Sequence, residues 1–144
     1  MPIGFPDWFR PWSQFGGSSH RSRGELTLNQ GATDTVLTVS GKGQLLGGYG
    51  YGYGVGVDQS DRFVLYVDGS IIFNFPFQTM LWRNLFYIHT SPLYLIQYDT
   101  TNGEFTVGIS PYIPFLSSVQ FDYSSGTSGP NTVLVEVELI YSTM

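Results

Sequence analysis

The chain has 144 residues, of which 42% are hydrophobic, 17% are aromatic and only 12% are charged, against about 25% charged residues in an average soluble protein. This length predicts a single domain with one core. The hydrophobic content excludes an intrinsically disordered chain, which needs low hydrophobicity and high net charge. The absence of cysteine excludes a disulfide framework and a thiolate metal site.

The net charge of −5 is unevenly distributed along the chain. Residues 1–23 carry three arginines against one aspartate, a balance of +2, so the remaining residues carry −7. An acidic body repels nucleic acid and anionic lipid, so we expect no nucleic-acid partner. The longest uncharged stretch, residues 105–121, contains two prolines and several serines and therefore predicts no membrane-spanning helix.

Residues 1–23 form a distinct aromatic segment. Its three prolines prevent a long helix, and the run Gly16-Gly17-Ser18-Ser19 predicts a flexible hinge. Large aromatic side chains of the kind that dominate interface energetics lie close together in it: Phe5, Trp8, Phe9, Trp12 and Phe15. We therefore predict an extended N-terminal arm over 1–23 whose five aromatic residues bind a neighbouring subunit. The alternative is that they fold back onto their own domain.

From Glu25 onward, apolar and polar residues alternate with a period of two between turn-forming residues, which indicates successive β-strands. No segment of helical period is longer than about two turns. The predicted strands are 25–29, 33–40, 44–57, 62–67, 70–75, 80–88, 92–98, 104–109, 117–124 and 132–141.

Three of the connections have the composition of hairpin loops. Asp68-Gly69 supplies the positive φ angles of a tight two-residue turn between two apolar runs. Residues 99–103 and residues 124–131 are rich in Asp, Asn, Ser and Gly, which favour turns. Each predicts that the strands on either side of it are neighbours in one sheet.

The last predicted strand places Val133, Val135, Val137 and Leu139 on one face, with Glu136 and Glu138 among the residues of the other face. That alternation is typical of a strand with one face in a core and the other in contact with water. The sequence therefore predicts an all-β fold, in which residues 24–144 form a two-sheet antiparallel β-sandwich, jelly-roll-like, preceded by the arm. A small closed barrel is the alternative.

Residues 47–57 alternate glycine with larger side chains. As a strand, this segment places Tyr49, Tyr51 and Tyr53, followed by Val55 and Val57, on one face and only glycine on the other. A glycine face admits the close approach of another backbone or an aromatic ring. We predict that the three tyrosines bind a partner, either as a subunit contact or as a row that stacks on sugar rings. An internal strand covered by bulky neighbours, or a low-complexity loop, is the plain structural alternative.

Titratable groups for catalysis are few. Asp58 and Asp61 lie close together in a loop that fits a solvated polar turn better than a calcium site. Glu136 and Glu138 share a strand face, where their spacing fits an exposed acidic stripe as well as it fits a glycosidase pair. We therefore predict that the protein is not an enzyme, and we expect no catalytic residue, no cofactor and no metal site.

Several segments together resemble small β-sandwich virion proteins of tailed bacteriophages, which include head decoration and tail-associated proteins. They are residues 35–43, 63–70 and 114–119 and the valine-rich last strand with its terminal Tyr141. The resemblance covers about residues 25–142 and lies in the pattern. It implies a virion component present in several symmetric copies.

These features together predict a structural virion protein, located in the virion, that forms a homo-oligomer and contacts other virion subunits through its sandwich and its arm. No membrane partner is expected. The alternative from another class is a carbohydrate-binding or host-adhesion module with a glycan as partner, because exposed tyrosines on a β-sandwich can stack on sugar rings. A hydrolase that acts through carboxylates is the third hypothesis.

Overall fold

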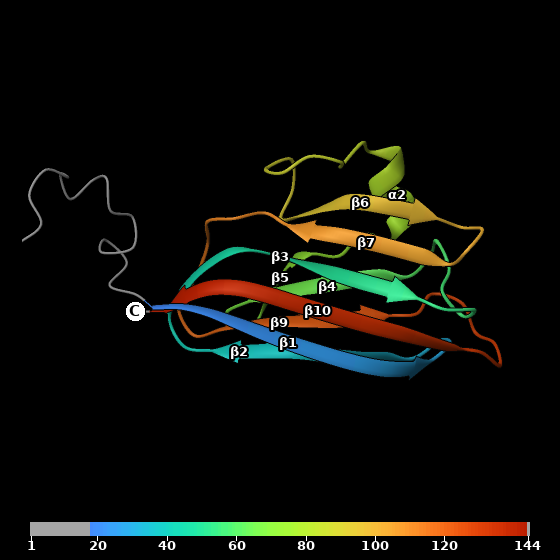
Figure 1. Ribbon diagram of the computed structural model, residues 1–144, viewed down its shortest axis with the longest axis horizontal. Helices are drawn as coiled ribbons and strands as arrows, with labels where there is room; N and C mark the ends of the chain where they lie inside the picture. The colour runs from blue at the N-terminus through green and yellow to red at the C-terminus, as the bar shows by residue number, and fades with distance from the viewer. Residues whose placement is uncertain (1–17, 144) are drawn as a thin grey trace, which may run out of the picture.

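A computed structural model describes residues 18–143, which fold into two antiparallel β-sheets packed face to face (Figure 1). The predicted all-β sandwich is confirmed. Within these residues no helix is long and apolar enough to cross a membrane. The elements in chain order are β1 (Ser18–Asn29), β2 (Thr33–Ser40), β3 (Gly43–Tyr53), β4 (Arg62–Val67), β5 (Ser70–Phe73), α2 (Phe77–Trp82), β6 (Leu93–Asp99), β7 (Glu104–Ile109), β8 (Ile113–Phe115), β9 (Ser118–Ser124) and β10 (Thr132–Thr143).

The strand order identifies the sandwich as a jelly roll. Sheet A has the order β1-β10-β3-β7-β6, with β8 pairing β3, and sheet B has the order β2-β9-β4-β5. Apart from β6 and β8, the strands pair from the two ends of the chain inward. Strand β1 pairs with β10, β2 with β9, β3 with β7, and β4 with β5. This is one long hairpin rolled into two sheets, which is the pairing of an eight-stranded jelly roll.

Buried aromatic rings fill the space between the sheets. Phe63 and Tyr123 project from sheet B, and their ring centroids lie 5.0 Å apart in an edge-to-face arrangement. Phe77 of α2 stacks on Phe105 of sheet A with centroids 4.8 Å apart. Aromatic pairs at these separations stabilise a core beyond the area they bury. The predicted inward face of β10, from Val133 to Leu139, is buried against this cluster.

The predicted strands 33–40, 62–67 and 104–109 coincide with β2, β4 and β7. Strand β1 differs most, because it begins at Ser18 rather than at Glu25. The prediction that Ser18 and Ser19 belong to a flexible hinge is wrong, since they pair with Thr143 and Ser142 of β10.

The remainder of the predicted arm, residues 1–17, lies outside the described residues. It contains all five of the aromatic residues predicted to bind a partner, Phe5, Trp8, Phe9, Trp12 and Phe15. These assignments therefore stay predictions.

The predicted strand at 80–88 is also wrong, because the chain forms the short helix α2 there. Phe77 and Met80, three residues apart, lie on one side of this helix and are buried in the core. Pro76 precedes the helix and Asn84, with a φ of 55°, follows it. A helix of six residues has too few turns to show a helical period in the sequence.

Two of the three predicted hairpins are confirmed. Asp68 and Gly69 have φ angles of 52° and 81°, and the loop 99–103 connects the paired strands β6 and β7. The third is wrong, because β9 lies in sheet B and β10 in sheet A, so residues 125–131 cross from one sheet to the other. A Ser- and Gly-rich loop permits either connection, and only the pairing of β10 with β1 and β3 decides between them.

The β4–β5 turn is tied to the segment between β8 and β9 by one carboxylate. Asp68 accepts hydrogen bonds from the backbone N–H groups of Leu116 at 2.9 Å, Ser117 at 2.7 Å and Ser118 at 3.1 Å. These bonds favour the charged form and lower the pKa of Asp68 to about 2. The two turns at this end of the sandwich are thereby held together.

We predict that Asp68→Asn lowers the melting temperature at pH 7, because it removes the charge that these N–H groups bind. A carboxyl group whose pKa is lowered on folding stabilises the protein above its ordinary pKa of 3.8, and that contribution is lost as the pH falls through about 2. Melting curves of both proteins should therefore differ at pH 7 and converge at pH 2. Asp34→Asn, an exposed carboxylate on β2, is the control. An equal difference at both pH values would contradict the assignment.

Candidate binding surfaces

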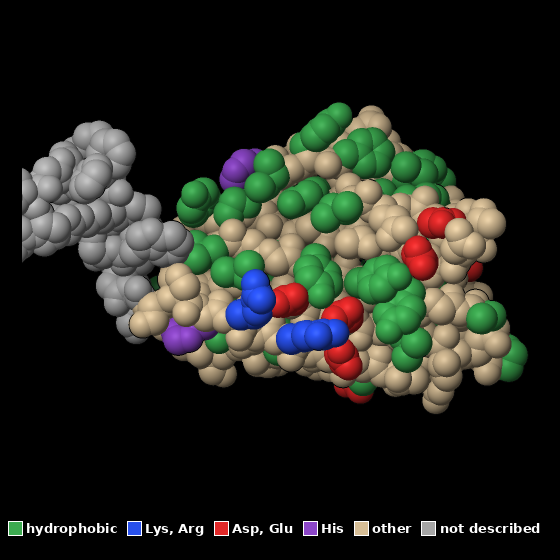
Figure 2. Space-filling view, in the orientation of Figure 1, with side chains coloured by type: hydrophobic (Ala, Val, Ile, Leu, Met, Phe, Trp, Pro, Cys, Tyr) green, Lys and Arg blue, Asp and Glu red, His purple; other side chains and the backbone are tan. Residues whose placement is uncertain are grey.

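The predicted tyrosine row lies on the outer face of sheet A. Tyr49, Tyr51 and Tyr53 are half-buried and belong to β3, the central strand of this sheet. In register, Tyr51 is flanked by Glu136 of β10 and Thr106 of β7. Figure 2 shows this face, with basic side chains and part of the acidic ones gathered over β1 and β10, hydrophobic side chains beside them over β3, and further acidic side chains toward the β6–β7 turn.

The opposite side of β3 is the glycine face, and it is covered by aromatic rings of sheet B. A Cβ atom on Gly50 would lie 2.9 Å from the ring of Phe63, and one on Gly52 would lie 2.8 Å from the hydroxyl oxygen of Tyr123. Of the two close approaches that a glycine face admits, it is an aromatic ring that makes this one, and the alternative of an internal strand covered by bulky neighbours is confirmed for this side of β3. The prediction that Val55 continues the tyrosine face is wrong, because β3 ends at Tyr53 and Val55 is 84% exposed in the following loop.

Burial and nearby carboxylates raise the pKa of two tyrosines of the row, Tyr49 and Tyr51. Partial burial, and then the charges of Glu136 and Glu138, raise the pKa of Tyr49. Partial burial, and then the charge of Glu104, raise the pKa of Tyr51. Tyr51 and Tyr53 also stack on each other, with ring centroids 4.6 Å apart. The row therefore presents neutral phenols at Tyr49 and Tyr51, and the ring of Tyr51 supports that of Tyr53.

Arginines of β1 neutralise part of the acidic character of this face. The Nε of Arg21 lies 2.9 Å from a carboxylate oxygen of Glu138. The Nη2 of Arg23 contacts both Glu136 and, at 2.6 Å, Glu25. The side chains of Glu136 and Glu138 are less than 20% exposed, so the interpretation of this pair as an exposed acidic stripe is wrong. Both carboxylates are engaged by arginine.

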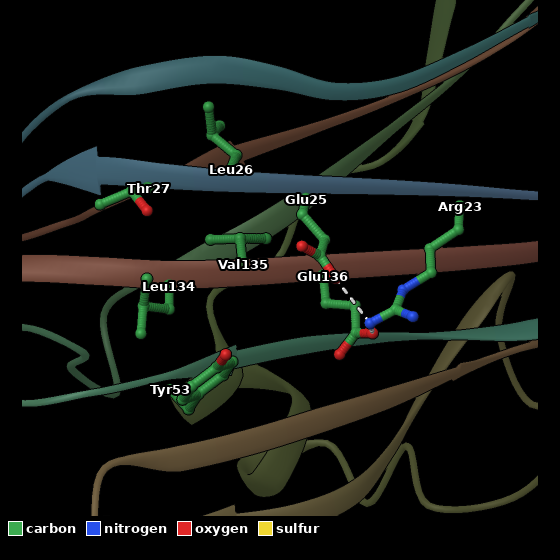
Figure 3. A pocket seen from close by; sticks show the side chains of 8 residues that line it. All are labelled: Arg23, Glu25, Leu26, Thr27, Tyr53, Leu134, Val135 and Glu136. Carbon is green, nitrogen blue, oxygen red and sulfur yellow. Dashed lines mark ion pairs between the residues drawn. The ribbon is translucent and has the colours of Figure 1, made fainter.

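A shallow hollow of about 320 Å³ lies beside the tyrosine row, over β1, β10 and β3. Figure 3 shows Arg23 and the carboxylates of Glu25 and Glu136 at one end of it, and Leu134 and the ring of Tyr53 at the other. The hollow therefore combines an aromatic wall with a cluster of charged hydrogen-bonding groups.

A second surface lies at the margin of sheet A, where α2 and the loop after it pack beside β6. Four large apolar side chains there are between 49% and 70% exposed, and we call them the apolar margin: Trp82, Tyr87, Ile88 and Ile96. Figure 2 shows hydrophobic side chains gathered over this part of the molecule. Next to it, the rings of His89 and Tyr112 lie nearly parallel with centroids 6.4 Å apart, and both residues have a positive φ of 68°.

The acidic loop before β4 has a structural role. Asp61 is fully buried and accepts hydrogen bonds from the Tyr123 hydroxyl at 2.7 Å and the Gly126 N–H at 2.8 Å. The interpretation of this loop as a solvated polar turn is therefore wrong for Asp61, although Asp58 is only partly buried and caps Ser60. Among residues 18–143 no group of three or more His, Asp and Glu is placed to hold a metal ion.

Some residues of these surfaces could not be found from the sequence. Arg21 and Arg23 were predicted to belong to the N-terminal arm over 1–23, and nothing local shows that they face Glu136 and Glu138 across a strand pair. Trp82 lies in the unpredicted helix.

Comparisons with models of known protein families and with curated proteins find no match to this chain. The fold and the outer face of sheet A define the class of protein. It is a jelly-roll β-sandwich that carries a row of tyrosines beside paired arginine and glutamate side chains.

We predict that Gly50→Val destabilises the fold by about 1–3 kcal/mol, because the added side chain would overlap the ring of Phe63 and force the sheets apart. Urea unfolding measures the change. Thr38→Val places the same side chain on the exposed face of β2 and should change the free energy of unfolding by less than about 0.5 kcal/mol. Equal effects of the two substitutions would contradict the close approach of the sheets at Gly50.

Proposed function

We propose that this protein is a non-enzymatic structural subunit of a virion, and that it self-associates through the apolar margin and through its aromatic N-terminal segment. The proposal rests on the margin, where four large apolar side chains are about half or more exposed and are not among the side chains that pack against the core of the described residues. A jelly roll is a frequent fold of capsid domains, and the resemblance of the sequence pattern to phage virion proteins agrees with this assignment.

The margin adjoins an edge of sheet A, which limits how a second copy can bind. Strand β6 is the last strand of this sheet, and its pairing with β7 is irregular between Leu95 and Gln97, where Ile96 is exposed. The Leu95 N–H already donates to the Leu85 carbonyl at 2.6 Å. A bulged and partly covered edge discourages the addition of another strand. Self-association at this margin would therefore proceed by packing of side chains.

The scarcity of charge on the chain supports the same function. Only 12% of residues are charged, so few charges would have to lose water when subunits pack together. The carboxylates that the sequence offered for catalysis serve the fold instead. Asp61 accepts a hydrogen bond from Gly126 and so holds the loop 125–131 that crosses between the sheets. Glu136 and Glu138 form ion pairs with arginines. These roles favour a structural protein over a hydrolase.

We expect the purified protein to be a homo-oligomer that the double substitution Trp82→Ser and Ile96→Lys converts to a monomer, because the lysine would have to be buried without a partner. Size-exclusion chromatography with light scattering measures the mass, and melting curves confirm that the variant is folded. Val55→Lys changes an exposed apolar residue outside the margin and should leave the oligomer intact. A wild-type monomer at the highest soluble concentration would overturn the proposal.

The aromatic segment provides the second contact. Each of its five rings can contribute about 1.5–3 kcal/mol when fully buried. Because Ser18 pairs with Thr143, residues 1–17 can be removed without loss of any described strand pair. The chain they form can extend to about 60 Å, which is long enough to reach a neighbouring subunit. We propose that Trp8 and Trp12 bind there.

Deletion of residues 1–17 should leave the melting temperature of the sandwich nearly unchanged and should reduce incorporation into the oligomer or particle. Light scattering and co-assembly with the full-length chain measure the effect. The full-length variant with Trp8→Ser and Trp12→Ser is the matched control for chain length and should reproduce the defect. If the truncated chain assembles as well as the intact one, or no longer folds, the segment is not an intermolecular contact.

A further inference from the structure

The hollow beside Tyr53 has a lining that restricts what can bind in it. Arg23 lies between the carboxylates of Glu25 and Glu136, so the charged groups sum to −1. A negative lining disfavours anions such as phosphate or an acidic sugar. A metal ion would have to displace the guanidinium group of Arg23 and would find two carboxylates, fewer than the six to eight oxygen ligands that calcium takes.

Neither an apolar ligand nor a second copy of this face fits the hollow. An apolar ligand would cover Arg23, Glu25 and Glu136 without replacing their bonds to water. The outer face of sheet A carries two arginines, Arg21 and Arg23, against four glutamates on the strands β1, β7 and β10. Two copies placed face to face would therefore bring like charges together.

The charged groups in the hollow hold one another in place and can still donate and accept hydrogen bonds. The printed contacts of Arg23 with the two carboxylates run through Nη2. A guanidinium group carries five N–H donors, more than these two contacts use. Glu25 and Glu136 contact Arg23 through Oε1, and an ionised carboxylate has about four lone-pair sites with which to accept further hydrogen bonds. A ligand that both donates and accepts hydrogen bonds, and that carries no net charge, matches this set.

The other end of the hollow is apolar. Tyr53 forms a wall there, with its ring supported by the stack on Tyr51, and Leu134 lies next to it on β10. A ligand held against both ends must have an apolar surface on one side and several hydroxyl groups at its edge. Pyranose sugars have this arrangement, since their C–H bonds form a face and their hydroxyls lie around the ring.

We infer that this hollow binds a neutral pyranose unit of a glycan. The Tyr53 ring packs against the C–H face of the sugar, Arg23 donates hydrogen bonds to its hydroxyls, and Glu25 and Glu136 accept hydrogen bonds from them. Tyr51 and Tyr49 continue along the same face of β3, where neighbouring sugars of an oligosaccharide would lie. The inference goes beyond the proposed function and does not depend on it.

Saturation-transfer difference NMR and calorimetric titration of the full chain test the inference with neutral oligosaccharides of glucose, galactose, mannose and N-acetylglucosamine, and with sialyllactose as the acidic probe. At least one neutral probe should bind, with sialyllactose weaker. Tyr53→Ala should weaken binding about tenfold. Tyr66→Ala, on the outer face of sheet B, should leave it unchanged. Glu25→Gln alters an exposed side chain and should weaken binding with the melting temperature retained.

Several results would overturn the inference. They are the absence of binding by every neutral probe at millimolar concentration, a preference for sialyllactose, or binding that survives both Tyr53→Ala and Glu25→Gln. A loss of oligomers in folded Tyr53→Ala, without any glycan affinity in the wild type, would assign the face to a subunit contact instead. A monomeric protein that binds a neutral glycan would support the hollow and overturn the proposed self-association, so the two proposals fail separately.

Discussion

The close contact between the glycine face of β3 and the aromatic rings of sheet B sets the geometry of the molecule. Phe63 and Tyr123 occupy the space where side chains of residues 50 and 52 would otherwise lie. Interiors are packed at the density of organic crystals, so a single added methyl group at either glycine would have to move a ring. The same contact places the Tyr123 hydroxyl within reach of Asp61, which in turn holds Gly126 in the loop that crosses between the sheets.

The chemistry of the outer face follows from the same alternation. Because successive side chains of a strand point to opposite faces, glycines turned toward the core require that the tyrosines of β3 point outward. Large aromatic groups on the outside are costly unless something covers part of them, and here they support one another and lie beside Glu136 and Glu138. Arginines from β1 then limit the repulsion among these carboxylates. The result is a face that offers rings and hydrogen-bonding groups together.

The two outer faces of the sandwich carry different side chains. The outer face of sheet B contains a polar network in which Thr35, Gln120 and Asp122 hydrogen-bond to one another, beside Tyr66 and the exposed Ile71. Sheet A carries the tyrosine row in its centre and the apolar margin at its β6 edge. A subunit that packs through its margin would leave the tyrosine face accessible, so assembly and glycan binding are compatible on one domain.

The sequence alone determined the elements whose signals are local. Period-two alternation located β2, β4 and β7, the Asp68-Gly69 dipeptide located a hairpin, and the glycine alternation placed the tyrosines of β3 on one face. Tertiary structure decided what depends on distant partners. The residues from Ser18 to Arg23 lack apolar alternation and become a strand only because β10, more than a hundred residues away, supplies hydrogen bonds and carboxylates. The helix α2 forms because Phe77 and Met80 fill the core. Strands β9 and β10 separate into two sheets because their loop permits either connection and the long-range pairing of β10 with β1 and β3 decides.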